Sequence, residues 1–279
     1  MKATTKLLLA AGVLTAVKGL DNRLEVTHFE PEFENLAKEF DGFKIAQISD
    51  LHSESTPGVC EEIKAHNPDI IVITGDMIHD DDRPYKPVIS LIRRLSLIAP
   101  LYVISGNHDL WNTNFNKFIK EAEDNGAIYI DNKKAIIEKD GSFIELFGVR
   151  DPYSKSADMI IKSLDESFSS LPEKEHFSIL LFHRANQFDR IKDKGFDLIL
   201  SGHMHGGQFR IPGVLGVASP KSGIGDTQRL LFPKYYAGTF HHENTTMIVN
   251  RGLGNPMIIP RLFNRPEIGI IELKKKPRA

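Results

Sequence analysis

The first half of the chain alternates short apolar runs with amphipathic segments. The apolar runs lack a strict apolar and polar alternation, which is typical of strands covered on both faces. They span residues 43–49, 69–74 and 101–105. The segments between them place apolar residues at helical spacing and span residues 59–66, 86–97 and 115–125. Strands that alternate with helices in this way predict an α/β sheet with parallel strand pairs.

The second half of the chain is richer in strands. Residues 135–137 and 143–147 flank the turn sequence Lys139-Asp140-Gly141, which predicts a hairpin. Helices are expected at 156–169 and 186–192, and further strands at 177–182, 196–200, 208–211, 230–232, 235–240, 245–249 and 268–273. Two sheets packed face to face, with helices outside, would hold both halves in one domain.

The N-terminal residues resemble a targeting segment. Lys2 and Lys6 precede the apolar run 7–17, like the start and apolar core of a signal peptide. The run is shorter than the roughly 20 residues that a membrane span needs. An export signal (cleaved or uncleaved), a membrane-surface anchor and an ordinary amphipathic helix all stay open. We expect residues 1–20 to be a signal-like or membrane-anchor segment, 21–42 a lead-in arm and 43–279 the catalytic domain. The expected location of the protein is membrane-associated or exported, and the alternative is cytoplasmic.

Composition narrows the chemistry that the chain can support. Cys60 is the single cysteine among 279 residues, so an internal disulfide and a cysteine-based zinc cluster are excluded. Any metal must bind to His, Asp, Glu or Asn side chains, which favours zinc, manganese or iron. The net charge of -2 argues against a nucleic-acid partner, since such proteins usually carry a basic face.

Polar side chains of the metal-binding type follow five of the predicted strands. The carboxyl ends of parallel strands meet at one edge of a sheet, where ligand sites form. Each residue alone has an ordinary alternative, such as a turn cap for an Asp, a left-handed turn for an Asn or a hydrogen-bonded core position for a His. Together they predict a metal site, and they are Asp50, His52, Asp76, Asn107, His108, His183, His203 and His205.

The order of these residues resembles that of one superfamily. The motifs are Asp50-x-His52, Gly75-Asp76, Gly106-Asn107-His108-Asp109, His183 and Gly202-His203-x-His205. They occur as in the calcineurin-like metallophosphoesterases and span roughly residues 43–207. The runs 206–212, 251–254 and 265–268 further resemble the bacterial YkuE/YaeI-type branch. The resemblance implies an α/β fold, a four-layer α/β/β/α sandwich of two mixed sheets flanked by helices.

The resemblance also implies a role for each motif residue. The seven expected ligands divide into Asp50, His52 and His205 for one divalent metal ion, Asn107, His183 and His203 for a second, and Asp76 as the bridge. A hydroxide that bridges the two ions (manganese, zinc or iron) would attack phosphorus. His108 would be a general acid for the leaving group. Asp109 could accept the other N–H of His108, with a structural turn hydrogen bond as the alternative.

Other polar and aromatic residues have weaker signals. Arg184 adjoins an expected ligand and could bind substrate phosphate, or it could pair with a neighbouring acid. The charged loop 79–82 is expected to be solvated, and His241 and His242 to form a surface pair. Trp111 and Phe115 are expected to pack in the core.

The leading functional interpretation is a hydrolase of phosphate esters. Phosphodiesters or pyrophosphate-linked lipid precursors fit the N-terminal segment, which could contact a membrane surface, better than protein phosphate does. The alternatives are a phosphomonoesterase, a non-catalytic scaffold that keeps the fold, and a nuclease. The presence of all seven ligands and His108 argues against the scaffold. The near-neutral charge argues against the nuclease.

Overall fold

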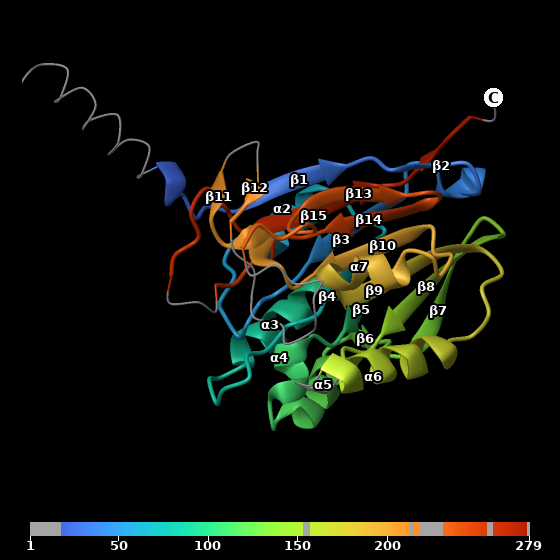
Figure 1. Ribbon diagram of the computed structural model, residues 1–279. Coiled ribbons are helices and arrows are strands. Elements are labelled where there is room, and N and C mark those ends of the chain that lie inside the picture. Colours follow the sequence, from blue (N-terminus) through green and yellow to red (C-terminus); the bar gives the residue numbers. More distant parts are fainter. Residues whose placement is uncertain (1–17, 153–156, 212–214, 218–230, 256–258, 278–279) are drawn as a thin grey trace, which may run out of the picture.

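Two six-stranded mixed sheets face each other in the computed structural model (Figure 1). The structure describes residues 18–152, 157–211, 215–217, 231–255 and 259–277. The first sheet has the order β1 (Glu25–Phe29), β15 (Glu267–Glu272), β3 (Lys44–Ile48), β4 (Ile70–Thr74), β5 (Leu101–Ile104) and β6 (Ala127–Tyr129). The second has the order β13 (Gly238–His242), β14 (Thr245–Val249), β10 (Leu198–Gly202), β9 (Phe177–Arg184), β8 (Ser142–Val149) and β7 (Lys133–Lys139). Neighbouring strands run parallel except in the pairs β15–β3, β13–β14 and β7–β8.

Helices cover the outer face of each sheet, so the fold has four layers. The helices α2 (Val59–Ala65), α3 (Lys86–Leu95) and α5 (Phe115–Asp124) pack on the first sheet in one apolar cluster. The helices α6 (Ala157–Ser169) and α7 (Phe188–Ile191) pack on the second sheet in another. A third apolar cluster fills the space between the sheets. The predicted α/β/β/α sandwich is therefore confirmed.

Strand β4 shows why its sequence is apolar throughout. Ile71 and Ile73 point into the cluster under the helices. Ile70 and Val72 point into the cluster between the sheets. Side chains alternate across a strand, so a strand with cover on both faces needs apolar residues at every position.

The predicted hairpin at Lys139-Asp140-Gly141 is also confirmed. Lys139 pairs with Ser142 across a two-residue turn. Asp140 and Gly141 have φ values of 51° and 80°, the two positive angles that a type I′ turn requires. The two strands, β7 and β8, extend further than the sequence pattern indicated.

Residues 25–40 belong to the fold and do not form a lead-in arm. Strand β1 pairs with β15, and β2 (Glu32–Phe33) pairs with β16 (Lys274–Lys275). Leu36 and Phe40, the latter in the 3₁₀ turn η1 (Lys38–Phe40), are fully buried between the sheets. The prediction was wrong because these few apolar residues are too widely spaced to show a period.

The N-terminal segment falls largely outside the structure. Residues 1–17 lie outside the described residues, as do the start of the predicted helix 156–169 and part of the predicted strand 230–232. Within the described ranges, no helix has the length and apolar character that crossing a membrane would require.

Short elements follow the strands at one end of the sandwich. They are α4 (Asn107–Trp111), the 3₁₀ turns η2 (Ala185–Gln187) and η3 (His205–Gly207), and the ribbon of β11 (Arg210–Ile211) and β12 (Leu215–Gly216). Two of them, α4 and η3, carry expected site residues.

Candidate metal centre

The expected ligands gather at the carboxyl ends of five parallel strands. Strands β3, β4 and β5 supply them from the first sheet, and β9 and β10 from the second. All are buried, with at most 3% of their surface exposed, and they are Asp50, His52, Asp76, Asn107, His183, His203 and His205. Burial of this many polar side chains is costly unless hydrogen bonds or a cation compensate it.

The backbone is strained at these residues. Asp50, His52, Asp76, His203 and His205 all have positive φ, between 46° and 75°. Side chains other than Gly seldom adopt this conformation, which costs of order 1–3 kcal/mol when the surroundings hold it in place. The strain turns consecutive loops inward, so that their side chains converge.

Two glycines of the motifs make room for this convergence. A Cβ atom at Gly106 would collide with Asp76 Oδ1, and one at Gly202 would collide with Ser49 Oγ and Asp50 Oδ2. Any side chain at either position would therefore push a carboxylate out of the centre. These glycines serve close packing around Asp50 and Asp76.

The first trio comprises Asp50, His52 and His205. The Nε2 atoms of His52 and His205 lie 3.2 Å apart, and His205 Nε2 lies 3.4 Å from Asp50 Oδ1. Asp50 also accepts a hydrogen bond from the backbone N–H of His203. Burial lowers the pKa of His205 to about 4 and holds the pKa of His52 well below its usual range. Both rings are therefore neutral at pH 7, as metal binding requires.

The second trio comprises Asp76, His183 and His203. His183 Nδ1 donates to the carbonyl oxygen of Thr74 at 2.7 Å, which fixes the ring. Its Nε2 faces Asp76 Oδ2 at 3.2 Å and His203 Nδ1 at 3.2 Å. Burial alone would lower the pKa of His183, but the charge and hydrogen bond of Asp76, with the charges of Asp50 and Asp151, together raise that pKa to about 10. Burial also lowers the pKa of His203.

Asp76 lies between the two trios. Its Oδ2 is 3.2 Å from His183 Nε2 and 3.8 Å from His52 Nε2. Its Oδ1 accepts the backbone N–H of His108 at 2.8 Å. One carboxylate thus contacts a member of each trio, and Asn107 directly precedes the residue that bonds to it.

The donor set fits divalent cations. Among the described residues, two buried atoms of the centre, Asn107 Oδ1 and His203 Nε2, find no hydrogen-bond partner. Buried polar atoms are nearly always satisfied, so such atoms call for an explanation. Carboxylate, amide and imidazole groups are the ligands of zinc, manganese and iron. The first trio contains the ligands predicted for one metal ion, Asp50, His52 and His205. The second contains His183 and His203, which were predicted for the other ion, and the predicted bridge Asp76.

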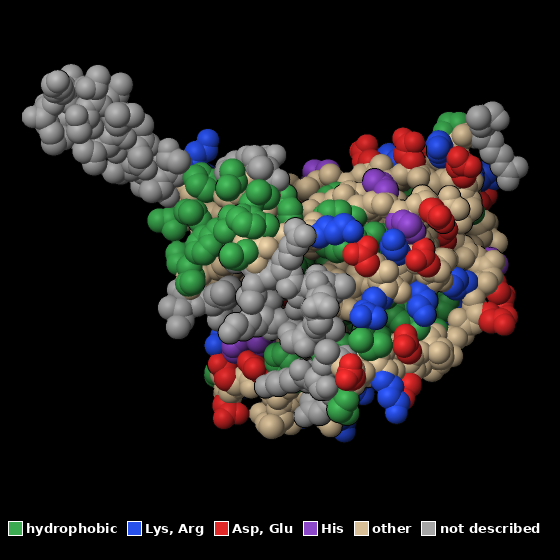
Figure 2. Space-filling model, in the orientation of Figure 1, with side chains coloured by type: hydrophobic (Ala, Val, Ile, Leu, Met, Phe, Trp, Pro, Cys, Tyr) green, Lys and Arg blue, Asp and Glu red, His purple; other side chains and the backbone are tan. Residues whose placement is uncertain are grey.

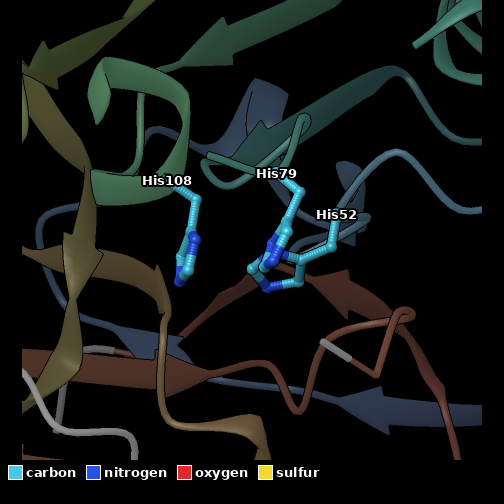
Figure 3. Close-up of side chains that lie close together, drawn as sticks. All are labelled: His52, His79 and His108. Atoms are coloured by element: carbon cyan, nitrogen blue, oxygen red, sulfur yellow. The ribbon is translucent and has the colours of Figure 1, made fainter. Parts of the chain in front are cut away.

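A third group of side chains shares His52 with the first trio, and its member His79 was missed from the sequence. Figure 3 shows the rings of His52, His79 and His108 close together, from α4 and from the loops after β3 and β4. His79 Nδ1 lies 3.2 Å from His52 Nδ1, and the His79 and His108 rings stack at 4.7 Å. His108 Nδ1 lies 3.1 Å from Asp80 Oδ1. His79 and Asp80 of the loop 79–82 are therefore part of the site, and their closeness to Asp76 in sequence was the available signal.

Asp109 takes its alternative role. Its Oδ1 accepts the backbone N–H of Ile78 and its Oδ2 that of Gly106, each at 2.8 Å. Burial, with the Asp76 charge nearby, raises the pKa of Asp109 well above its usual range. Its carboxyl group ties two loops of the site together, and Asp80 holds the position beside His108 that Asp109 was expected to have.

Arg184 is a structural residue and not a substrate ligand. Its guanidinium group is buried and donates to Asp151 through Nε at 2.7 Å and Nη2 at 2.8 Å. The expected contact with substrate phosphate is therefore wrong, because the group is engaged with Asp151 inside the fold. The alternative, pairing with a neighbouring acid, is what the structure shows.

The other residues with weaker signals lie in different parts of the structure, and one of them borders the site. His241 bonds to Thr246 and His242 to Asp193, away from the centre, as a surface pair. Phe115 packs in the core as expected. Trp111 instead lies with its ring 5.4 Å from that of His108 and borders the site.

Two further residues support His205 from behind, and no pattern in the sequence pointed to them. Arg261 Nη2 lies 3.4 Å from His205 Nδ1 and donates to the carbonyl oxygen of Gly254. Asn264 donates to the carbonyl oxygens of His205 and Gln208. They are about 60 residues from His205 in the chain, so only folding shows their role.

A two-sheet sandwich with His, Asp and Asn side chains around a shared carboxylate defines a metallohydrolase type of centre. Sequence comparison identifies the family. A model of the calcineurin-like phosphoesterases matches residues 43–207. The chain belongs to this family, and by membership it is a metallophosphoesterase, a hydrolase of phosphate esters.

Relatives place the chain in the YkuE/YaeI branch. The metallophosphoesterase YkuE of Bacillus subtilis is 31% identical over 283 residues, which cover 95% of this chain and 93% of YkuE. Phosphodiesterase YaeI of Escherichia coli is 27% identical, covering 83% of this chain and 82% of YaeI. The UDP-2,3-diacylglucosamine pyrophosphatase LpxG of Chlamydia muridarum is 25% identical, covering 92% of this chain and 91% of LpxG.

Proposed function

We propose that the chain hydrolyses phosphodiester or pyrophosphate bonds with two divalent metal ions. The observation that carries the proposal is the pair of neighbouring trios, in which Asp76 of the second trio also lies 3.8 Å from His52 of the first. Asp50, His52 and His205 would hold one ion, and His183, His203 and Asn107 the other. Asp76 would bind both, since only a carboxylate offers two oxygens to neighbouring cations.

The expected ligands of the two metal ions carry less negative charge than the ions carry positive charge. Two divalent cations supply Lewis acidity, which lowers the pKa of water and offsets charge on phosphoryl oxygens. The ligands carry two carboxylates, Asp50 and Asp76, and the others are neutral. The centre therefore keeps a net positive charge, which favours an anionic phosphate.

His108 is placed to move a proton. It lies at the edge of the centre with 21% of its side chain exposed. Asp80 accepts from its Nδ1, and its backbone N–H is held by Asp76. These contacts leave Nε2 to deliver a proton to the leaving oxygen of the ester, a contribution of about 10²–10⁴-fold in rate.

The surroundings favour a diester or a pyrophosphate over a monoester. The described guanidinium groups beside the ligands are engaged within the fold: Arg184 with Asp151, Arg251 with Glu25 and Glu267, and Arg261 with backbone carbonyls. A monoester dianion gains more from such groups than a phosphate with a single charge does. The names of YaeI and LpxG, a phosphodiesterase and a pyrophosphatase of a nucleotide-linked acylated sugar, support the same class.

The test is hydrolysis by purified protein with manganese or zinc. A bis-nitrophenyl phosphate diester should be cleaved faster than nitrophenyl phosphate, and Asp76→Ala should lose both the activity and bound metal. Asp82→Ala, an exposed acid of the same loop, is the matched control and should keep both. Faster cleavage of the monoester would support the phosphomonoesterase instead.

Metal analysis separates the enzyme from a scaffold. After growth with ample metal, the protein should contain about two metal ions per chain. A content below about one per chain would favour the non-catalytic scaffold. Activity that survives Asp76→Ala would contradict the two-metal proposal.

A further inference from the structure

Large apolar side chains gather on one exposed face of the molecule. Figure 2 shows them over the end where Figure 1 places β11 and β12. We call this surface the apolar patch; its most exposed members are 46% to 59% exposed and are Leu20, Ile211, Leu231, Phe232 and Ile259. The other exposed large apolar residues of the described chain are Leu97 in the loop after α3, Ile128 in β6, Ile136 in β7 and Met159 in α6. Single exposed apolar residues are ordinary, whereas a gathered patch marks an interaction site.

The fold holds the patch in place through its backbone. Arg210 N–H donates to the carbonyl of Leu262 at 2.9 Å, and Phe232 N–H to the carbonyl of Val217 at 2.9 Å. Phe263 N–H donates to the carbonyl of Gly19 at 2.6 Å. Segments far apart in the sequence are thus joined, and the patch is a built surface.

The patch is attached to the metal centre. Gln208, three residues after His205, donates from Nε2 to the carbonyl of Ile259 at 2.7 Å. Asn264 binds the carbonyls of both His205 and Gln208. A partner that binds the apolar patch would therefore lie next to the loop that carries His205, a member of the first trio.

The chain enters the body at this patch. Gly19 lies so close to the Leu262 and Phe263 side chains that a Cβ atom there would collide with them. The sequence just before it contains the apolar run 7–17 with Lys2 and Lys6 ahead of it. Lys18 is exposed beside the patch. Arg23 nearby is also exposed, but its guanidinium group is paired with Asp21, so Lys18 is the cation that this edge of the patch offers.

A lipid surface matches these features together. Stable membrane attachment of a peripheral protein takes two signals, because one apolar insertion gives marginal binding. Cations beside an apolar face add attraction to anionic headgroups. We propose that the apolar patch docks on an anionic phospholipid bilayer, next to the point where residues 1–17 join, and so holds the metal centre at the membrane surface.

The test is flotation of the full chain with vesicles of phosphatidylcholine and phosphatidylglycerol. The unaltered protein should float with the vesicles. Leu231→Asp combined with Phe232→Asp should weaken binding by about tenfold or more, because two apolar side chains lose their burial. Leu97→Asp, at a side chain 84% exposed outside the patch, should leave binding unchanged.

Three results would overturn the proposal. The first is unaltered protein that does not float. The second is a patch variant that binds as tightly as the unaltered protein, which would assign binding to residues 1–17 alone. The third is a dimer in light scattering that the patch variant loses, which would make a second copy the occupant. Hydrolysis of a soluble diester should be equal in all variants, so failure of the docking proposal is distinct from failure of the proposed function.

Discussion

The two trios of the metal centre contain similar side chains but hold their protons differently. In the first, burial lowers the pKa of His205 to about 4 and keeps His52 neutral. In the second, Asp76 together with the charges of Asp50 and Asp151 outweighs burial and raises the pKa of His183 to about 10. The distances explain the difference, because Asp76 Oδ2 lies 3.2 Å from His183 Nε2 and 3.8 Å from His52 Nε2.

The comparison shows how the Asp76 carboxylate affects the histidines of each trio. In the protein without metal, a proton on His183 supplies the positive charge that Asp76 needs. A cation that binds the second trio must displace this proton, since only a neutral imidazole is a ligand. His52 and His205 of the first trio are already neutral at pH 7, so each can present one ring nitrogen to a metal without losing a proton.

The largest effect on metal content and activity should come from two single variants, each of which removes one ligand from one trio. His52→Gln and His183→Gln should each lower the metal content from two ions to one per chain. Each should reduce kcat/KM by more than the roughly 10⁴-fold that general acid catalysis alone could supply. Elemental analysis and diester hydrolysis measure both effects. His242→Gln, at a surface histidine bound to Asp193, is the control and should change neither. Two retained ions in either ligand variant would break the division into trios.

The next effect concerns the proton on the leaving group beside the first trio. His108→Ala should slow hydrolysis of an alkyl diester by about 10²–10⁴-fold. A nitrophenyl diester should be far less affected, because its leaving group needs no proton. Asp80→Asn should show the same dependence on leaving group with a smaller loss.

Asp109 supplies the contrast for that experiment. Asp109→Asn should lower the free energy of unfolding by about 1–3 kcal/mol, because it disturbs two buried hydrogen bonds. Urea denaturation measures this loss. A rate loss in Asp109→Asn that depends on the leaving group would return the orienting role to Asp109.

The pH dependence of metal binding tests the comparison directly. Below its pKa of about 10, His183 carries a proton that the metal must displace. Affinity at the second trio should therefore rise about tenfold per pH unit through the neutral range and up to about pH 10. At the first trio, affinity should be nearly flat above pH 5, because the pKa of His205 is about 4. Calorimetric titration of His52→Gln isolates the second trio, and that of His183→Gln the first. If metal affinity had the same slope against pH in both variants, the proposed difference in protonation between the two trios would be refuted.

The smallest effect should come from His79. For His52 to bind a metal through Nε2, its Nδ1 must carry the proton, and His79 Nδ1 at 3.2 Å is placed to accept it. His79→Phe should weaken metal binding at the first trio by about 10–100-fold. His79→Asn, which keeps an acceptor, should restore part of the affinity, and the second trio should not change. Equal affinity of His79→Phe and the unaltered protein in the metal titration would show that His52 needs no such partner.

Much of the fold and of the ligand set could be predicted from local patterns. Apolar runs without alternation indicated strands covered on both faces, and β4 has that environment. Polar residues that followed these runs had to meet, because parallel strands end at one edge of a sheet. The lead-in arm was wrong because β1 is held by β15, which comes more than 200 residues later.

The sequence by itself determined most of the strand and helix order after residue 43, the family and the seven expected ligands, since these depend on spacing along the chain. The tertiary structure alone decided the partner of each charged group. It placed Arg184 with Asp151, Asp80 with His108 and Asp109 between two loops. It also decided which trio holds a proton. The reason is physical: hydrogen bonds, burial and pKa values depend on distances of a few ångströms between segments that are far apart in the sequence.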